Sequence, residues 1–392
     1  MWPLFFILIA LGAILEAVSL RRDPSKVDLE YEISAITAEP GSPFILRVII
    51  ANKSRVPISY LVVNEIYPQT AALPADMPFR VTHYGLQIKK VCRVRGMQRK
   101  KIIFETSIDK RGVHSFKGDS IEFGDFLGFR EISKRIASRR EVVIFPEKIE
   151  CRGLTDALGS YYGDIAARRF LIRDPLLTAG YREYTGREPM KDISWLQSAR
   201  LGEMMVREYD HNRQISACVV LSVDGVDINA EEEMDDLCSI TRAVGESLLE
   251  LGASVSFYTN ARLKNKDDDD VFHCEVSIGR AGSFLESLGR AVSYTRCPLG
   301  RLLEYAHHKS DYDAAFVVVL PTMFKNTAGT AQSAGLSKTP GAATPPGAAN
   351  PRGAATPSGR LSGGMETIER FRNITGREIM VVDTGDYLGE VV

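Results

Sequence analysis

The sequence predicts an α+β protein of several domains, in which a membrane helix, an antiparallel β-sandwich and an α/β domain follow one another. Three observations lead to this expectation. The first twenty residues are almost wholly apolar, residues 27–150 read as short strands between turns, and residues 215–392 alternate apolar strands with amphipathic helices. The 392 residues suffice for two or three domains that each bury a core. The net charge of -1 gives no general attraction to nucleic acid, and we expect no nucleic-acid partner.

Residues 1–22 are expected to form a single-pass anchor in the cell membrane. The run from Trp2 to Leu20 is apolar except for Glu16 and Ser19, and its length is close to the roughly 20 residues that cross a bilayer. Arg21 and Arg22 follow it directly, so the positive-inside rule places the rest of the chain in the cytoplasm. A cleaved signal peptide is the alternative, although the basic segment that should precede it is missing.

The region from residue 27 to residue 150 favours an antiparallel β-sandwich. Its short runs are rich in Val, Ile, Phe and Tyr, and turn signals such as "EPGSP" and "NKSRVP" separate them. Between Gly41 and Asn52 apolar residues recur at every second position, which is typical of a half-buried strand. No helical period persists through this region, so we expect strands throughout.

The region from residue 215 to residue 392 favours a mostly parallel sheet covered by helices on both faces. The strand Ala217–Leu221 precedes a helix with apolar residues at helical spacing and Gly252 as its C-terminal cap. Further helices are expected at 283–294, 302–307 and 366–373, between strands at 253–259, 314–321 and 377–385. Residues 326–364 consist almost wholly of Ala, Gly, Pro, Ser and Thr, and we expect this insertion to be disordered.

Two stretches of the sequence have an order and spacing of residues that are informative beyond amino-acid composition. The first runs from Asp109 to Phe129, "DKRGVHSFKGDSIEFGDFLGF", and "VVIFP" follows it at 142–146. The second runs from Tyr181 to Asp210, within the connecting segment 151–214. In order and spacing, both are similar to the two signatures of the bacterial family called domain of unknown function 58. The residues that match the second signature are Arg182, Glu183, Tyr184, Gly186, Ile193, Trp195, Ser198, Ala199, Arg200, Val206, Arg207 and Glu208.

Some residues depart from the family pattern. Gly186 precedes Arg-Glu where the family usually has two acids, and Gln197 stands where a Lys is common. Members usually carry two N-terminal membrane helices, whereas one is visible here. The resemblance implies a von Willebrand factor A-like α/β domain over 215–392 and a MoxR-type AAA+ ATPase as the protein partner.

The second signature has two interpretations. In the structural one, Trp195 packs the junction between this segment and the α/β domain. Arg200 and Arg207 would then pair with Glu183, Glu203, Glu208 or Asp210 in a buried network. In the functional one, exposed Arg and Tyr side chains bind a partner. The candidate residues are Arg182, Tyr184, Trp195, Ser198, Arg200, Arg207 and Glu208.

The loop after Ala217–Leu221 stands where A-like domains bind Mg²⁺ through Asp-x-Ser-x-Ser. One register reads Ser222, Asp224, Val226, and the other reads Asp224, Val226, Ile228. Neither supplies a leading carboxylate with two hydroxyls, so we expect a degenerate metal site. Asp224 and Asp227 are expected instead to form turns or to cap the helix that begins near Glu231. They are also the weak candidates for a Mg²⁺ site, which would be the only cofactor.

No nucleophile and base have a revealing spacing, and none of the six histidines suggests a triad or a metal site. The expectation is therefore a membrane-anchored, non-enzymatic scaffold or assembly factor that works with the AAA+ ATPase. Two alternatives remain open. One is a divalent-metal-dependent binding protein or hydrolase that uses Asp224 and Asp227, and the other is an exported binding protein.

Overall fold

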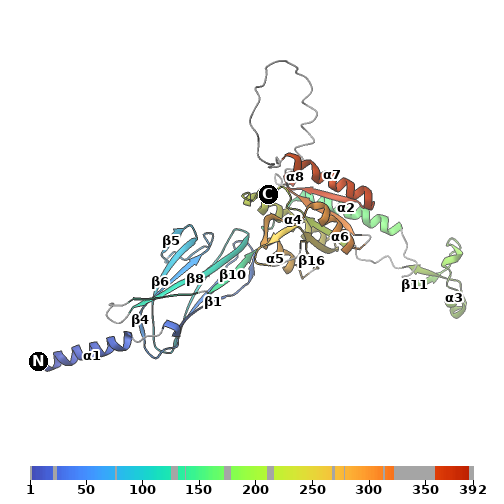
Figure 1. Ribbon diagram of the computed structural model, residues 1–392. Helices are drawn as coiled ribbons and strands as arrows, with labels where there is room; N and C mark the ends of the chain where they lie inside the picture. Colours follow the sequence, from blue (N-terminus) through green and yellow to red (C-terminus); the bar gives the residue numbers. More distant parts are fainter. Residues whose placement is uncertain are drawn as a thin grey trace, which may run out of the picture. The chain divides into compact units, whose positions relative to one another are not determined.

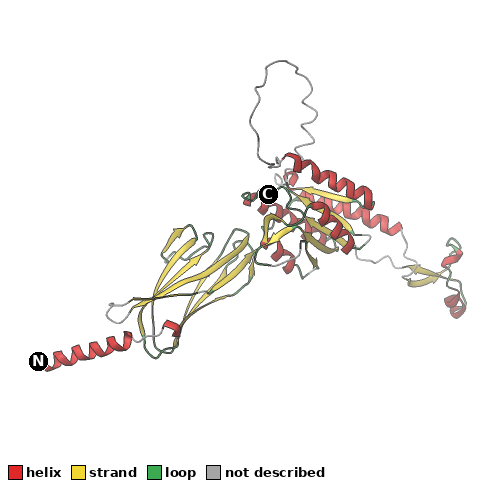
Figure 2. Cartoon of the chain, in the orientation of Figure 1, coloured by secondary structure: helices red, strands yellow, loops and turns green. Residues whose placement is uncertain are grey.

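The computed structural model has a β-rich unit and an α/β unit, which confirms the predicted α+β organisation (Figures 1 and 2). The first unit comprises Met1–Glu147 with Leu285–Ala291, and the second comprises Lys148–Phe284 with Val292–Val392. The structure describes residues 2–20, 24–75, 77–124, 131–136, 138–171, 178–209, 216–266, 270–277, 279–311, 314–321 and 358–387.

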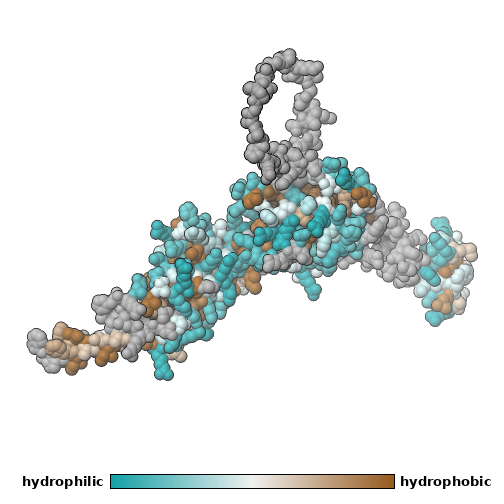
Figure 3. All heavy atoms as spheres, in the orientation of Figure 1, coloured by the Kyte–Doolittle hydropathy of each residue, from teal (hydrophilic) through white to brown (hydrophobic). Residues whose placement is uncertain are grey.

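The N-terminal segment is helical, as predicted, from Trp2 to Leu20 (α1). Large apolar side chains on α1 are exposed, among them Phe5 and Phe6 at 61% and 62%. Figure 3 shows these apolar residues along the helix. Within the described part of the chain, no helix combines the length and apolar character that a membrane crossing requires. A short 3-10 turn, Pro24–Lys26, precedes the first strand.

The β-rich unit contains two sheets, as the alternating pattern of the sequence predicts. One sheet has the order β1-β3-β7 and is antiparallel. The other has the order β2-β10-β8-β4-β6-β5, and β9 also pairs with β8. The strand bounds are β1 Val27–Ile33, β2 Thr37–Ala38, β3 Phe44–Asn52, β4 Ile58–Tyr67, β5 Phe79–Thr82, β6 Gly85–Val94, β7 Gln98–Thr106, β8 Gly112–Gly124, β9 Glu131–Arg135 and β10 Arg139–Ile144.

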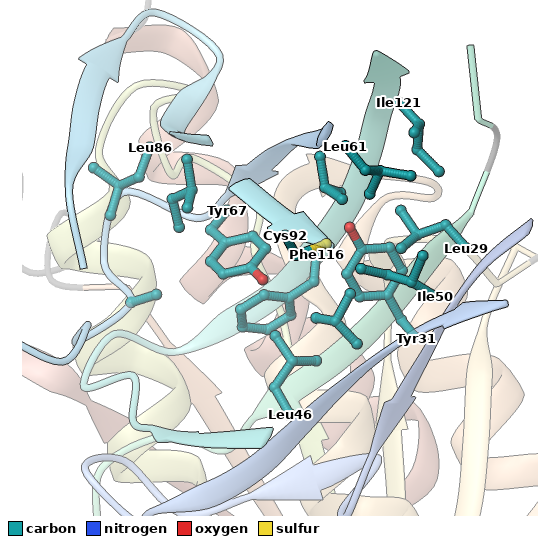
Figure 4. Close-up of a cluster of buried hydrophobic side chains, with 14 of the residues drawn as sticks. Leu29, Tyr31, Leu46, Ile50, Leu61, Tyr67, Leu86, Cys92, Phe116 and Ile121 are labelled. Atoms are coloured by element: carbon teal, nitrogen blue, oxygen red, sulfur yellow. The ribbon is translucent and has the colours of Figure 1, made fainter. Parts of the chain in front are cut away.

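The two sheets enclose one apolar core, part of which Figure 4 shows. Every second residue of β3 contributes, because successive side chains of a strand point to opposite faces. Leu46, Val48 and Ile50 are therefore completely buried. Tyr67 and Phe116 pack edge to face at 5.1 Å in the same core. The period-2 pattern thus identifies the inward face of the sandwich correctly.

The α/β unit is built on a sheet with the order β16-β14-β13-β18-β19. Four strands are parallel and β16 is antiparallel, which agrees with the predicted mostly parallel sheet. One face packs on α6 and α7 through residues such as Leu302 and Phe371. Helix α4 also packs on the sheet, against β13, β14 and β18. The bounds are β13 Ser216–Leu221, α4 Glu231–Glu250, β14 Ser254–Thr259, β16 Phe272–Val276, α6 Leu299–Lys309, β18 Ala315–Leu320, α7 Ser358–Thr375, β19 Ile379–Asp383 and α8 Thr384–Tyr387.

Three boundaries differ from the expectation. The helix expected at 283–294 is α5, Gly282–Arg290, and it ends because Ala291–Thr295 forms β17, which pairs with β15, Ala261–Leu263. Residues 326–357 of the expected disordered insertion lie outside the described residues. Its last part, residues 358–364, belongs instead to α7, since packing of α7 on α6 outweighs the low helix propensity of its glycines.

The connecting segment contains a helix that the sequence pattern did not reveal, α2, Arg152–Leu171. It lacks a clear amphipathic period, and it is stabilised by tertiary contacts with α4. The Tyr161 hydroxyl donates to the backbone carbonyls of Phe316 and Glu378, at 3.1 and 2.9 Å. Burial raises the pKa of Tyr161 to about 12. These contacts join residues that are far apart in the chain, so local periodicity does not report them.

Candidate functional site

The loop after β13 lies at the carboxyl edge of the parallel strands, beside the end of β14. Asn260 follows β14 and is completely buried. Its amide donates to Asp224 Oδ1 at 3.1 Å and to the Cys297 carbonyl at 2.9 Å. Its own Oδ1 accepts from the backbone N–H of Val223 at 3.1 Å. The carboxyl ends of β13 and β14 therefore share one hydrogen-bonded network.

The second oxygen of Asp224 caps a helix. Oδ2 accepts a hydrogen bond from the backbone N–H of Leu299, the first residue of α6, at 2.8 Å. The N-cap residue of α6 is Pro298, which provides no side-chain acceptor. Because the first N–H groups of a helix lack partners within the helix and carry positive partial charge, a carboxylate stabilises them. Asp224 thus caps α6 and not α4, which corrects the helix assigned to it from the sequence.

Asp227 has a separate and local role. It is exposed, and its Oδ1 accepts from the backbone N–H of Asn229 at 3.0 Å, which forms the predicted turn. Asp227 and Asp236 also raise the pKa of Glu233, although partial burial is the larger cause. Across the ranges described above, no group of three or more His, Cys, Asp and Glu side chains is placed to hold a metal ion. Both oxygens of Asp224 already serve polypeptide donors.

The second signature folds as a separate small element, which we call the motif module, residues 178–209. Strands β11, Thr178–Glu183, and β12, Met205–Tyr209, pair antiparallel. A 3-10 turn, Met190–Asp192, and a seven-residue helix, α3, Trp195–Leu201, connect them. Ile193 and Val206 form a β-bridge and are 3% and 2% exposed, so they make the small core of the module.

Ser198 fixes α3 to the hairpin. Its hydroxyl donates to the carbonyl of Ser194 at 2.8 Å and accepts from the backbone N–H of Met205 at 2.9 Å. Gly202 ends the helix in a left-handed conformation with φ 77. The inward side of α3 is therefore occupied by a polar residue whose hydrogen bonds are satisfied.

Two large apolar side chains of α3 are exposed, which contradicts the predicted packing of Trp195 at a domain junction. Trp195 is 62% exposed and Leu196 is 67% exposed. At about 100° per residue, Leu196 and Arg200 lie about 160° from Ser198, whereas Trp195 lies about 60° from it. Leu196 therefore faces away from the hairpin that the Ser198 hydroxyl contacts, and Trp195 is exposed at the start of the helix. Further exposed apolar residues of the module are Tyr181, Met190, Leu201 and Met204.

Among the described residues of the signature, Arg200 and Arg207 do not pair with Glu183 or Glu203, two of the partners expected from the sequence. Arg182 pairs with Glu188 at 2.6 Å, and the Thr185 hydroxyl donates to the same carboxylate at 2.7 Å. Those hydrogen bonds, from Thr185 first and Arg182 second, lower the pKa of Glu188 to about 2. Arg200 and Arg207 are exposed, and among the described residues neither makes an ion pair with a carboxylate.

All seven candidate residues of the signature belong to the motif module. Trp195, Ser198 and Arg200 lie on α3, Arg182 and Tyr184 lie on β11 and directly after it, and Arg207 and Glu208 lie on β12. Tyr184 is held by its backbone, whose N–H donates to the carbonyl of Met204 at 2.8 Å. The side chain of Glu208, and Asp210, lie outside the described residues. The sequence did not identify Met190, Leu196, Leu201 and Met204 as exposed apolar residues of this module. The only sequence feature that marks them is their apolar character, without a helical period.

Three solved protein modules show low similarity to part of this chain. A cohesin module of a family 33 glycoside hydrolase from Clostridium perfringens is 12% identical, with a TM-score of 0.24, over 30% of this chain and 97% of that module. A CARDB domain from Pyrococcus furiosus is 12% identical, with a TM-score of 0.21, over 30% and 88%. A non-cellulosomal cohesin from Archaeoglobus fulgidus is 18% identical, with a TM-score of 0.21, over 30% and 91%. No protein-family model matches the chain, and no curated protein matches it.

Proposed function

We propose that this chain is a membrane-attached, non-enzymatic protein-binding protein whose binding surface is the outward face of the motif module. The observation that carries the proposal is the exposure of two large apolar side chains at the start of α3, Trp195 at 62% and Leu196 at 67%. An exposed Trp beside other apolar side chains is uncommon on a free surface and frequent at the centre of protein interfaces. Burying such residues against a partner would remove this apolar surface from water.

The arrangement of polar groups also supports binding. Ser198 joins α3 to the hairpin, and the exposed Arg182–Glu188 pair orders the loop after β11, at hydrogen-bond distances of 2.6 to 2.9 Å. A surface that is already ordered loses less entropy when a partner binds. Arg200 stands beside the apolar face and is exposed, and Arg is one of the residues enriched among those that dominate binding energy.

The partner follows from the resemblance to domain of unknown function 58, which implies a MoxR-type AAA+ ATPase. In this proposal, the chain acts as a scaffold or assembly factor for that ATPase on the cytoplasmic side of the membrane. Membrane attachment is assigned to α1, because its exposed Phe5, Phe6 and Ile7 require an apolar environment. The position of Arg21 and Arg22 after α1 supports a cytoplasmic body.

A crosslinked pull-down from native membranes tests the proposal. The full-length protein and the variants Trp195→Ala and Arg200→Ala serve as baits, and Tyr84→Ala removes an aromatic side chain that is 87% exposed outside the module. We expect an AAA+ ATPase with the unmutated bait and with Tyr84→Ala, and a loss of at least about tenfold with Trp195→Ala. Undiminished capture by Trp195→Ala would remove the module from the interface. Absence of any AAA+ ATPase with the unmutated bait would remove the partner.

A further inference from the structure

The β-sandwich carries a strongly basic hairpin that the proposed function does not use. Residues 89–101 read "KKVCRVRGMQRKK", in which seven of thirteen residues are Lys or Arg and none is acidic. They form the end of β6, the turn and the start of β7. The net charge of the whole chain is -1, so this density of positive charge is local.

Two loops meet at this end of the sandwich, and a buried side chain joins them. Asn52 is 2% exposed, and its amide donates to the carbonyls of Val56 and Arg95 at 2.9 and 3.1 Å. Its Oδ1 accepts from the backbone N–H of Ser54 at 3.0 Å. A Cβ at Gly96 would lie 2.1 Å from the carbonyl oxygen of Arg55, so the loops are in direct contact. This end is therefore a defined surface.

Four arginines surround the meeting point, and we call them, together with Met97, the polybasic tip. Arg55, Arg93, Arg95 and Arg99 are all exposed. In the part of the chain described, none of them makes an ion pair with a carboxylate. Met97 projects at the turn with φ 56 and is 70% exposed. An apolar side chain among unpaired guanidinium groups suits a surface that is anionic outside and apolar beneath.

The strand register relates the polybasic tip to the start of the sandwich. Val27, the first residue of β1, pairs with Asn52, and Asn52 pairs with Gln98 at the start of β7. Asp28 on the same strand forms ion pairs with Lys53 at 2.6 Å and with Lys134 at 3.5 Å. Six residues, 21–26, stand between Leu20 of α1 and Val27, so the seven steps of the chain span at most about 25 Å. The tip thus lies at the end of the sandwich from which the chain leads to α1.

We propose that the polybasic tip binds the anionic headgroups of a phospholipid bilayer. Exposed Lys and Arg next to a membrane segment are attracted by the negative surface potential of anionic lipids, by about a factor of five in affinity per residue. Met97 would enter the boundary between headgroups and acyl chains. The choice of a bilayer over a nucleic acid rests on the membrane attachment proposed for α1. The contact would set the orientation of the sandwich on the membrane.

Vesicle partitioning of the full-length protein tests the proposal. We would compare phosphatidylcholine vesicles with phosphatidylcholine–phosphatidylserine vesicles, at low and high salt. The test variant combines Arg55→Gln, Arg93→Gln, Arg95→Gln and Arg99→Gln. The control combines Arg280→Gln, Lys309→Gln, Arg370→Gln and Arg372→Gln, which are exposed in the α/β unit. Each set removes four positive charges and changes the net charge from -1 to -5 (-1 minus 4).

We expect the unmutated protein and the control to prefer serine-containing vesicles, and the test variant to bind them at least about tenfold more weakly at low salt. High salt should remove the difference in binding to serine-containing vesicles between the test variant and the unmutated protein, because it screens exposed charges. Equal binding by the test variant at low salt overturns the proposal. The preference of the unmutated protein for serine-containing vesicles, and the salt dependence of that preference, are measured without a variant. The proposal can therefore be tested even if the test variant does not fold.

Two further outcomes separate this proposal from the proposed function. Partitioning into both kinds of vesicle without a serine preference would leave the attachment through α1 standing and overturn the role of the polybasic tip. No partitioning into either kind would overturn both. A mobility-shift assay with duplex DNA tests nucleic acid as the competing partner. If DNA binding depends on the four arginines and the unmutated protein shows no preference for serine-containing vesicles, the polybasic tip is assigned to nucleic acid and the lipid proposal is overturned.

Discussion

The carboxylate of Asp224 accepts a hydrogen bond from the backbone N–H of Leu299 at 2.8 Å, 75 residues further along the chain. Its other oxygen accepts from the amide of Asn260 at 3.1 Å. Asp224, a candidate metal ligand in the sequence, thereby caps α6 at the carboxyl edge of the α/β sheet. This relationship makes the loop a structural element of the domain.

Replacing Asp224 should therefore lower stability without involving a metal. We expect Asp224→Ala to reduce the free energy of unfolding by about 1 to 2 kcal/mol, because α6 loses its cap and the buried Asn260 amide loses an acceptor. Thermal unfolding with and without Mg²⁺ measures this. Asp227→Ala, which removes only a turn contact, is the control and should cost about 0.5 kcal/mol or less. A Mg²⁺-dependent rise in melting temperature that Asp224→Ala abolishes would instead support the metal-dependent alternative.

The β-sandwich contains a buried ion pair between adjacent strands of one sheet, and a hydrogen bond from Tyr31 links this pair to the other sheet. Glu65 is completely buried and lies 2.7 Å from Lys90 Nζ. Tyr31 and Tyr67 donate to the same carboxylate at 2.8 and 2.9 Å. Burial, followed by the charge of Glu65, raises the pKa of both phenols, so they remain donors at any pH at which the protein is folded.

We expect Glu65→Ala to lower the free energy of unfolding by about 3 to 5 kcal/mol, because it leaves the Lys90 ammonium buried without its partner. Urea unfolding followed by circular dichroism measures the change. Glu30→Ala on the exposed face of β1 is the matched control and should change stability by about 0.5 kcal/mol or less. A similar small loss for Glu65→Ala would mean that the pair is solvated in solution.

In the motif module, a buried residue and the proposed interface residue stand two positions apart. Ile193 is 3% exposed, so Ile193→Ala should destabilise the module by about 2 to 4 kcal/mol through the cavity it leaves. Trp195 is 62% exposed, so Trp195→Ala should change stability by about 0.5 kcal/mol or less. Hydrogen exchange of the amides of β11 and β12 measures both effects. A large loss of protection in Trp195→Ala would return Trp195 to the structural interpretation.

The loop that follows β11 should loosen in acid. The pKa of Glu188 is lowered from 4.5 to about 2 by hydrogen bonds from Thr185 and Arg182. A carboxyl whose folded pKa is depressed stabilises the fold above its unfolded pKa, and this contribution is lost as pH falls from about 4.5 through about 2. The Thr185 amide donates to Glu188 Oε2 at 3.1 Å, so its protection, the intrinsic exchange rate at each pH divided by the measured rate, should fall over this range. Glu188→Gln should exchange faster at neutral pH and lack this acid transition, and an unchanged pH profile in that variant would exclude Glu188 as its source.

Local patterns were sufficient to predict the two structured regions and most of their elements. The period-2 alternation in β3 marks the side chains that the second sheet buries, and the apolar strand Ala217–Leu221 lies at the centre of the α/β sheet as β13. These predictions succeed because the periods of strands and helices determine which face is apolar, whatever the partner of that face is.

Contacts between distant residues decided the remainder. The Ser198 hydroxyl on α3 accepts a hydrogen bond from the backbone N–H of Met205 on β12, and Trp195 on the same helix is 62% exposed. Likewise, β17 forms because it pairs with β15, although the sequence favours continuation of a helix. The sequence by itself determined the order of the domains, the faces of their strands and the basic character of residues 89–101. Only the tertiary structure decided that Asp224 caps α6 and that Asn52 joins the two loops of the polybasic tip, because each depends on a hydrogen bond between residues that approach one another only after the chain has folded.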